Sequence, residues 1–419
     1  MSDKISAQRF HHVEYYCGDA RTTASRFMFG LGMELCAKSD QSTGNSIHAS
    51  YVVQSGEMRM LFTAPYGPGI SGKSTSSPFP GFDPSAVQQF HSKHGLAVKA
   101  VAIEMSDVQA SFDAMIQNGG VSVTPPCEMR DENNLLGGLV ETTGVVKFAE
   151  VTLYGDVILR LVDTSKYRGS FLPNFQSVNS GRFNSSRGNF GLTRFDHIVG
   201  NLWSLEPTLA RLKAMTGFHD FAEFVSEDVG TVDSGLNSVV LANNNEFILL
   251  PLNEPTFGTR RKSQIQTYLE QNCGEGVQHI ALSTNDVFYT MENMRSASGS
   301  GGFEFMERPG ADYYVNLRRR LGASLDEAQY TKIEELGLLA DKDDQGVLLQ
   351  VFTKPVGDRA TLFLEIIQRI GCIMGGDPSG KGSAGGKEWQ KPGCGGFGKG
   401  NFKDLFKSIE DYEATLKGI

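Results

Sequence analysis

The stretch Arg194-Phe195-Asp196-His197-Ile198 decides the fold, because it is a second copy of Arg9-Phe10-His11-His12-Val13, 185 residues earlier (9 to 194). The same shift carries Gly32-Met33 onto Gly217-Phe218. An internal repeat on this scale governs how the rest of the chain is interpreted, because each copy is expected to form the same supersecondary unit. The sequence therefore predicts a duplication.

Two further pairs of segments extend the repeat. They are Val101-Ala102-Ile103 with Asp107-Val108 against Ile280-Ala281-Leu282 with Asp286-Val287 (a separation of 179, from 107 to 286), and Val157-Ile158-Leu159-Arg160 against Leu362-Phe363-Leu364-Glu365. Helix-like stretches at Thr23–Phe29 and Glu206–Met215 follow the first strand of each copy, and alternating runs such as Leu348–Phe352 predict strands. Each half is expected to run strand, helix, several strands, helix, strands, which makes the fold α+β.

Length and composition limit the classes of function. At 419 residues the chain exceeds one ordinary domain, and its 40% hydrophobic content suffices for a full core. A net charge of −9 argues against a nucleic-acid partner, because phosphate binding requires a dominant basic surface. The basic runs Arg318-Arg319-Arg320 and Arg260-Arg261-Lys262 are interpreted as solvated surface. We expect a small-molecule ligand rather than a nucleic acid.

Cysteine usage and the first residues predict a cytoplasmic protein. The six cysteines contain no C-x-x-C pair and are interpreted as reduced thiols, not as a disulfide framework or zinc knuckle. Residues 1–9 are polar and lack the apolar run of a signal peptide. No apolar run approaches the roughly 18 residues that a membrane helix requires, so no membrane association is expected.

The repeat also divides the chain. The stretch Ser165–Gly191 is rich in Ser, Asn, Gly and Arg and has no periodicity, as in a linker. We predict a first domain at 1–164, a linker at 165–190 and a second domain at 191–419. The low-complexity segment 375–392 is interpreted as a tolerated surface loop.

The repeat is most informative where its two copies differ. Residues His197, His279 and Glu365 of the second half correspond to His12, Ala100 and Arg160 of the first. Glu365 lies in a very apolar strand, where a carboxylate is costly unless it is paired or binds a metal. A metal role predicts one complete set of ligands and one eroded set. The second half is therefore predicted to hold a metal.

The ligand types narrow the choice of metal. Two imidazoles and one carboxylate without a thiolate form the facial triad of oxygen-activating Fe(II) enzymes, which leaves coordination positions open. Zinc is the alternative on ligand type alone. The chain contains no H-E-x-x-H motif, which argues against a standard zinc protease. The interpretation is an Fe(II) site.

Several long stretches of the second half resemble the 4-hydroxyphenylpyruvate dioxygenase family, and the resemblance covers essentially the whole chain. They are Phe195-Asp196-His197, Asp228-Val229-Gly230-Thr231, Ser234-Gly235-Leu236-Asn237-Ser238, Leu252-Asn253-Glu254-Pro255, Lys262-Ser263-Gln264-Ile265-Gln266, Gly276-Val277-Gln278-His279, Asp343-Asp344-Gln345-Gly346, Glu365-Ile366-Ile367-Gln368-Arg369 and Gly395-Gly396-Phe397-Gly398-Lys399-Gly400-Asn401-Phe402. The resemblance implies vicinal oxygen chelate (βαβββ) modules that form two half-open β-barrels, the first of them degenerate.

The same resemblance implies conversion of 4-hydroxyphenylpyruvate and O₂ to homogentisate and CO₂, in tyrosine catabolism, by a dimer or tetramer. It also implies a polar shell around the substrate, formed by Ser238, Asn253, Gln264, Gln278 and Gln350. Strict alternation places Gln278 on the opposite strand face from His279 unless a bulge intervenes. The residues implied to pack against the substrate or to form a lid are Pro251, Phe352, Phe363, Phe397, Asn401 and Phe402.

The C-terminal region predicts a lid. Five glycines between Gly393 and Gly400 form a hinge, and no strand precedes them as a phosphate-binding loop would require. Asn401 is a candidate N-cap for an amphipathic helix over 402–417. We expect this helix to close over the barrel mouth, so that deletion of 393–419 abolishes turnover and leaves a folded, iron-binding protein.

Three alternatives remain open. The related 4-hydroxymandelate synthase shares the fold, the triad and the substrate but hydroxylates the benzylic carbon. An extradiol catechol dioxygenase also uses His/His/Glu but needs an acid–base histidine, for which His219 offers no clear strand context. A metal-free binding protein of the same fold gives no reason to keep Glu365 in an apolar strand.

Overall fold

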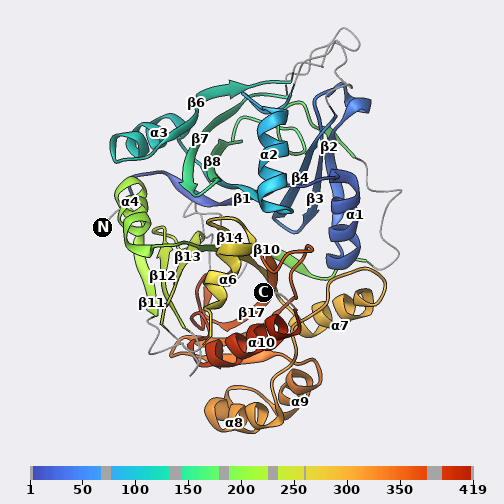
Figure 1. Cartoon of the computed structure of the whole chain (residues 1–419), viewed down its shortest axis with the longest axis vertical. Coiled ribbons are helices and arrows are strands. Elements are labelled where there is room, and N and C mark those ends of the chain that lie inside the picture. The colour runs from blue at the N-terminus through green and yellow to red at the C-terminus, as the bar shows by residue number, and fades with distance from the viewer. Residues whose placement is uncertain are drawn as a thin grey trace.

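The computed structural model describes residues 3–67, 77–131, 143–178, 188–224, 235–258, 261–374 and 389–416. Two large mixed sheets dominate it, and each is built by one half of the chain. The first half lies in the upper part of Figure 1 and the second half in the lower part. Helix α10 (Phe402–Thr415) runs across the lower sheet, and the pair α8 and α9 extends below it. The predicted α+β duplication is confirmed.

The first half forms a nine-stranded sheet in the order β6-β7-β8-β5-β1-β4-β3-β2-β9. Its strands are β1 (Ala7–Tyr16), β2 (Glu34–Ser39), β3 (His48–Ser55), β4 (Met58–Pro65), β5 (Ala97–Met105), β6 (Ser122–Met129), β7 (Val146–Tyr154), β8 (Val157–Asp163) and β9 (Gln176–Ser177). Its helices are α1 (Ala20–Leu31), α2 (Pro84–His94) and α3 (Val108–Gln117), with a short 3₁₀ turn at Gln41–Thr43.

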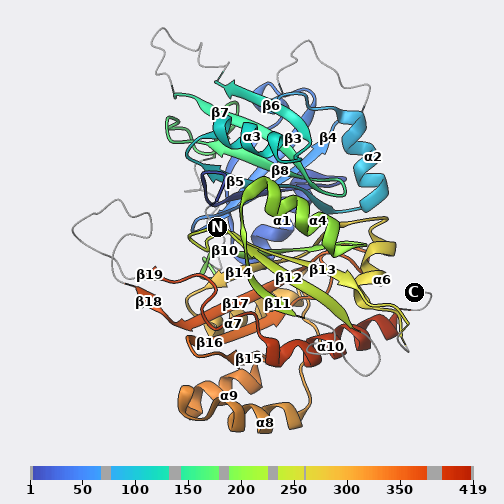
Figure 2. The ribbon, with the colours of Figure 1, turned by 90° about the vertical axis from the view of Figure 1, so that its left-hand side faces the viewer.

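The second half forms an eight-stranded sheet in the order β11-β12-β13-β10-β14-β17-β16-β15. Its strands are β10 (Leu192–Asn201), β11 (His219–Phe224), β12 (Leu236–Ala242), β13 (Leu249–Pro255), β14 (Gly276–Thr284), β15 (Leu339–Lys342), β16 (Gly346–Phe352) and β17 (Phe363–Gly371). Its further helices are α4 (Leu205–Thr216), α6 (Gln264–Gln271), α7 (Val287–Ser298), α8 (Ala311–Leu321) and α9 (Glu327–Glu335). The short strands β18 (Ile373–Met374) and β19 (Trp389–Gln390) pair separately and project to the side in Figure 2.

Each sheet contains two βαβββ modules that meet at its centre. In every module the first strand pairs in parallel with the last: β1 with β4, β5 with β8, β10 with β13 and β14 with β17. The two first strands of each half then pair with each other in antiparallel orientation. The predicted pair of half-open barrels is confirmed, and the central strands carry the residues of interest.

The repeated residues of the sequence have equivalent structural roles. Gly32 and Gly217 end helices α1 and α4 in the left-handed conformation, at φ 63° and 78°. Asp107 and Asp286 cap helices α3 and α7, because each carboxylate accepts a hydrogen bond from the backbone three residues later. These local signals explain why the repeat is visible in the sequence.

Three β-bulges recur at equivalent places in the two halves. The extra residues are Gln8, His11 and Lys99 in the first half and Thr193, Asp196 and Gln278 in the second. A bulge turns two successive side chains toward the same face of the sheet. Asp196 and His197 therefore point together, and so do Gln278 and His279. The bulge removes the conflict with strict alternation at Gln278.

In the first half, the position of Glu365 is occupied by Arg160. Arg160 lies beside Ala102 across β5 and β8, as Glu365 lies beside Ala281 across β14 and β17. Its guanidinium donates to Glu14 at 2.6 Å, to Glu150 at 2.8 Å and to His12 at 3.0 Å. Arg160 is only 2% exposed, and its charge fills the position that corresponds to the predicted metal site.

The two halves pack through a shared hydrophobic core that contains residues of both. The rings of Phe10 and Phe195 meet edge to face at 6.3 Å. Gly30 lies so close to Phe303 that a Cβ would come within 2.7 Å of its ring. Residues Phe171, Leu172 and Phe175, inside the predicted linker, pack on the first sheet, and residues 179–187 of that linker lie outside the described residues.

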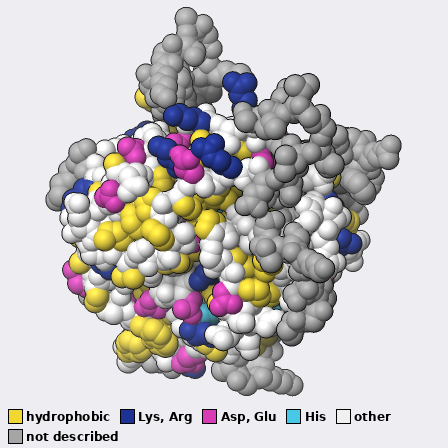
Figure 3. Space-filling model, turned by 90° about the horizontal axis from the view of Figure 1, so that it is seen from above, with side chains coloured by type: hydrophobic (Ala, Val, Ile, Leu, Met, Phe, Trp, Pro, Cys, Tyr) yellow, Lys and Arg dark blue, Asp and Glu magenta, His cyan; other side chains and the backbone are white. Residues whose placement is uncertain are grey.

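The face of the molecule seen in Figure 3 carries side chains of every kind. Figure 3 shows basic and acidic side chains next to one another, with apolar side chains between them. Across the described ranges, no helix is both long and apolar enough to pass through a bilayer.

Replacement of Arg160 by Ala would leave Glu14 and Glu150 buried without a cationic partner. Removing one member of a buried ion pair costs about 3–5 kcal/mol, so we expect the free energy of unfolding to fall by that amount in urea denaturation. A matched change at the half-exposed pair Lys262–Glu270 should cost less than about 1 kcal/mol. Equal losses in both variants would contradict the assigned role of Arg160.

Candidate metal centre

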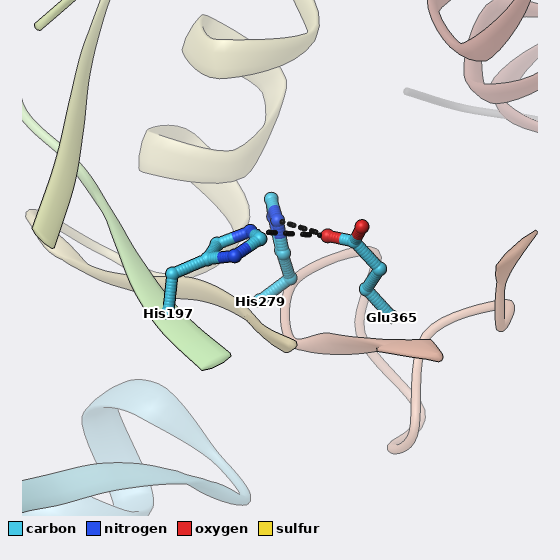
Figure 4. A group of neighbouring side chains, drawn as sticks. All are labelled: His197, His279 and Glu365. Carbon is cyan, nitrogen blue, oxygen red and sulfur yellow. Dashed lines mark ion pairs between the residues drawn. The ribbon is translucent and has the colours of Figure 1, made fainter. Parts of the chain in front are cut away.

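Three neighbouring strands bring His197, His279 and Glu365 together. His197 lies on β10, His279 on β14 and Glu365 on β17, and these strands are adjacent in the sheet. Oε2 of Glu365 lies 3.1 Å from Nε2 of His197 and 3.3 Å from Nε2 of His279. Figure 4 shows both rings directed at this one oxygen. All three side chains are buried, at 2–8% exposure.

The two bulges fix the orientation of the two imidazoles. Nδ1 of His197 lies 2.9 Å from Asp196, and Nδ1 of His279 lies 2.9 Å from Oε1 of Gln278. Both partners are acceptors, so each Nδ1 donates, and each Nε2 faces Glu365, where its lone pair could bind a metal once any proton on it is lost. This is the arrangement that fixes the tautomer and ring direction of metal-binding histidines. Gln278, predicted to contact substrate, thus also holds a predicted metal ligand.

The charges of His197 and Glu365 shift each other's pKa in opposite directions. Burial alone would lower the pKa of His197, but the charge of Glu365 and hydrogen bonds to Asp196 and Glu365 raise it to about 9. Burial would raise the pKa of Glu365, but the charge of His197 and hydrogen bonds from both histidines lower it to about 2. Burial also lowers the pKa of His279. In the metal-free chain, His197 is therefore protonated at neutral pH, and its positive charge balances the negative charge of Glu365.

The donor set fits a divalent transition metal. These three residues are the group of ligand-type side chains in the described chain whose donor atoms all lie within 4.8 Å of one another. Two ligands about 2.1 Å from one ion and at right angles would lie about 3 Å apart. The observed separations of 3.1 and 3.3 Å match that spacing without rearrangement of the strands.

A cavity opens beside the triad and is partly continuous with solvent. Its walls contain the predicted residues Pro251, Phe352, Phe363 and Phe397, together with the whole predicted polar shell: Ser238, Asn253, Gln264, Gln278 and Gln350. Within the described residues, the side chains of Ser238, Gln264 and Gln350 make no hydrogen bond, so their polar atoms are available to a ligand. Asn253 instead donates to Asn201 at 3.2 Å.

The aromatic residues frame the two histidines. Phe363 stacks on His279 with ring centroids 4.8 Å apart, and Phe352 meets the same ring edge to face at 6.0 Å. Phe397 meets His197 edge to face at 5.1 Å. The wall beside the triad is therefore apolar and flat-sided, as suits an aromatic ligand.

Several residues of the cavity wall were not among those predicted from the sequence. Leu405 and Ile409 of α10 complete the cavity, as do Val199, Phe224, Leu236, Val240 and Ile367. Leu405 and Ile409 are four residues apart on the face of α10 that turns inward, and this spacing was the available signal. The remaining five are ordinary apolar strand residues that carry no distinguishing signal.

Asn401 and Phe402 stand apart from the other predicted residues. Asn401 is buried but does not line the cavity, and its side chain makes no capping bond to α10. Its Oδ1 accepts from the hydroxyl of Tyr313 at 2.8 Å. Arg320, interpreted from the sequence as surface, donates to the carbonyl of Gly400 at 2.8 Å and anchors the start of α10. The side chain of Phe402 lies outside the described residues.

One interpretation of the cysteines was wrong. Cys372 and Cys394 form a disulfide, whereas Cys17, Cys36, Cys127 and Cys273 are free thiols as predicted. The two bonded cysteines are separated by 22 residues, and neither belongs to a recognisable spacing motif. The pairing arises because the end of β17 lies beside the glycine-rich segment (393–400) in space. Only the tertiary structure reveals this proximity.

Binding of a divalent metal at pH 7 should release close to one proton. The pKa of His197 is about 9 in the metal-free chain, so this imidazolium must lose its proton before Nε2 can bind a metal. Affinity should consequently rise by up to about tenfold per pH unit as pH approaches 9. Titration calorimetry in buffers of different ionisation enthalpy measures the proton count, and Glu365→Gln should reduce it; no proton release from the unaltered protein would contradict the assignment.

Known proteins are similar to this chain in sequence and in fold. No family model matches the chain. The 4-hydroxyphenylpyruvate dioxygenase of Daucus carota is 53% identical over 416 residues, which cover 99% of this chain and 89% of that protein. The enzyme of the same name from Plectranthus scutellarioides is 54% identical over 418 residues, covering 100% and 91%.

A solved mutant of 4-hydroxymandelate synthase from Streptomyces coelicolor has a TM-score of 0.73 at 23% identity, covering 98% of this chain and 100% of its own, and shares the fold. Identity above 50% over nearly the whole length, with the expected triad in place, decides the family. The chain belongs to the 4-hydroxyphenylpyruvate dioxygenase family.

Proposed function

We propose that this protein binds Fe(II) through His197, His279 and Glu365 and converts 4-hydroxyphenylpyruvate and O₂ to homogentisate and CO₂. The observation that supports this most directly is the buried triad at the side of an aromatic-walled cavity. Bound iron would supply O₂ activation and oxidative decarboxylation of the 2-oxo acid, because a three-ligand site leaves positions open for both. The side chains of the site would bind and orient the substrate and exclude water.

The charge balance of the cavity suits an anionic 2-oxo acid. None of the described residues that line it is Lys or Arg, and Glu365 is its only carboxylate. A divalent ion with one carboxylate ligand keeps a net charge of +1, which one substrate carboxylate neutralises. The substrate's acid end is therefore directed to the triad, and uncharged groups are left to orient the rest of the molecule.

The polar residues are placed to orient the ring. Ser238 and Asn253 are cross-strand partners on β12 and β13, on the far side of β10 from β14. Gln264 begins α6, and Gln350 lies on β16 two residues before Phe352. We propose that hydroxyl and amide groups bind the phenolic oxygen and that Phe352, Phe363 and Phe397 hold the ring between them. Amides and hydroxyls add no charge beside the reacting carbons.

The rest of the chain supports the site. We propose that residues 1–164 form a structural domain, in which Arg160 takes the place of a metal, and that residues 165–190 join it to the catalytic domain 191–419. Helix α10 contributes Leu405 and Ile409 to the cavity wall and would exclude water from it. It would act as a lid whose start is fixed by Arg320 and Tyr313.

Anaerobic loading with Fe(II), followed by 4-hydroxyphenylpyruvate and O₂, tests the reaction. We expect homogentisate, identified by mass and NMR, and a loss of at least about 10³-fold in turnover for Glu365→Ala, because one of three iron ligands is removed. Exclusive formation of 4-hydroxymandelate would keep the site and reject the proposed reaction. Iron binding without turnover of this substrate would reject the substrate as well.

Deletion of residues 402–419 tests the lid more cleanly than deletion of 393–419, because residues 394 and 396 bond to the buried Arg369. We expect turnover to be abolished and Fe(II) affinity to change by less than threefold, since no triad contact is lost. The control Lys407→Ala/Asp411→Ala alters only an exposed pair on the same helix and should retain turnover. Normal turnover of the truncated protein would overturn the role of α10.

A further inference from the structure

Arg369 is a buried cation that the proposed reaction does not use. It lies on β17, four residues beyond Glu365, and is only 3% exposed. Its guanidinium bonds to two parts of the protein. Nε and Nη2 donate to the two carboxylate oxygens of Asp196 at 2.9 and 2.8 Å, and Nη1 donates to the carbonyls of Cys394 and Gly396, both at 2.6 Å.

The first of these partners, Asp196, supports a predicted metal ligand, His197. Asp196 is fully buried, and its Oδ1 also accepts from Nδ1 of His197 at 2.9 Å. Burial would raise the pKa of Asp196, but the charge and hydrogen bonds of Arg369 hold it well below its usual range. Arg369 therefore fixes the anion that in turn fixes the imidazole of His197.

The second partner of Arg369 is the glycine-rich segment (393–400). Its Phe397 meets the ring of His197 at 5.1 Å, and the guanidinium carbon of Arg369 lies 5.5 Å from the centre of the Phe397 ring. The disulfide between Cys372 and Cys394 holds the segment beside the end of β17. The segment thus touches His197 directly through a ring and indirectly through Arg369 and Asp196.

Among its described residues, the first half has neither this arrangement nor the triad. By the strand register, His11 takes the position of Asp196. Counted along the chain from Arg160, the residue that corresponds to Arg369 is Thr164, which lies just past the end of β8. His11 and His12 contact each other through their Nδ1 atoms at 2.7 Å. A pairing required only to close the barrel would be expected in both halves. Its presence in one half alone associates it with the metal site.

We propose that Arg369 is a positioning residue that couples the seating of the glycine-rich segment to the orientation of His197. Metal binding at the triad and closure of the wall that carries Phe397 then stabilise each other. By linkage, whatever seats the segment raises metal affinity, and metal binding protects the segment by the same factor. The inference rests on the proposed metal site, but not on which product is formed.

Hydrogen exchange of residues 389–401, with and without Fe(II) under anaerobic conditions, tests the coupling. In the unaltered protein we expect iron to slow exchange in this segment severalfold. Arg369→Lys keeps one positive charge beside Asp196 but cannot bond two carboxylate oxygens and two carbonyls at once. We expect this variant to lose the iron-dependent protection and to bind Fe(II) about 10–100-fold more weakly.

Two variants separate coupling from simple instability. Arg160→Lys alters an equally buried arginine, paired with two carboxylates, in the half without the triad, and it should leave the iron-dependent protection intact. Asp196→Asn makes no change within the segment, and no hydrogen bond of Asp196 reaches it. It should nevertheless speed exchange at 393–398, because Arg369 loses its charged partner.

The outcomes are distinct. Failure of the unaltered protein to bind Fe(II) would reject the proposed function. Iron binding that leaves exchange of the segment unchanged would overturn the coupling alone, and this result needs no variant to fold. Arg369→Lys with protection equal to that of the unaltered protein, or Asp196→Asn with unchanged exchange at 393–398, would also overturn it.

Discussion

A carboxylate buried in an apolar strand has to be matched by positive charge, and this constraint organises the second half of the molecule. Glu365 is 2% exposed and lies between apolar neighbours on β17. Its charge is balanced by two imidazoles that the adjacent strands β10 and β14 present to it. The first half meets the same constraint in the opposite sense, with Arg160 among Glu14 and Glu150. One fold thus supports an internal ion network in one copy and a ligand-accepting cavity in the other.

The β-bulges allow the second sheet to fix the orientation of two imidazoles. In a regular strand the residue before a histidine faces the other side of the sheet and cannot bond to it. The bulges at Asp196 and Gln278 remove that restriction, so each histidine is held by its own sequence neighbour. The equivalent bulge at His11 likewise brings His11 beside His12, but Ala100 and Arg160 stand where the second half has His279 and Glu365. The bulges are therefore common to both halves, and the halves differ in the side chains placed on them.

Much of the fold and the site could be predicted from sequence because both depend on repeated local signals. The duplication is visible through helix-ending glycines and helix-capping aspartates, which any βαβββ module needs. The triad and polar shell followed from ligand types on strands and from resemblance. The disulfide, Arg320 and Arg369 could not be predicted, since each acts on a segment distant in sequence. Arg320 belongs to a basic run that looks solvated, and only the position of Gly400 reveals its partner.

The order of the site residues along the chain has a consequence for biosynthesis. His197, His279 and Glu365 all precede Phe397, Leu405 and Ile409, which close the cavity. Chains emerge from the ribosome N-terminus first, and their domains fold in that order. A nascent chain therefore possesses all three proposed metal ligands before it possesses the wall that shields them. A ribosome that stalls in this interval would expose the proposed metal centre to water, so synthesis of the final segment is the step that completes the cavity around it.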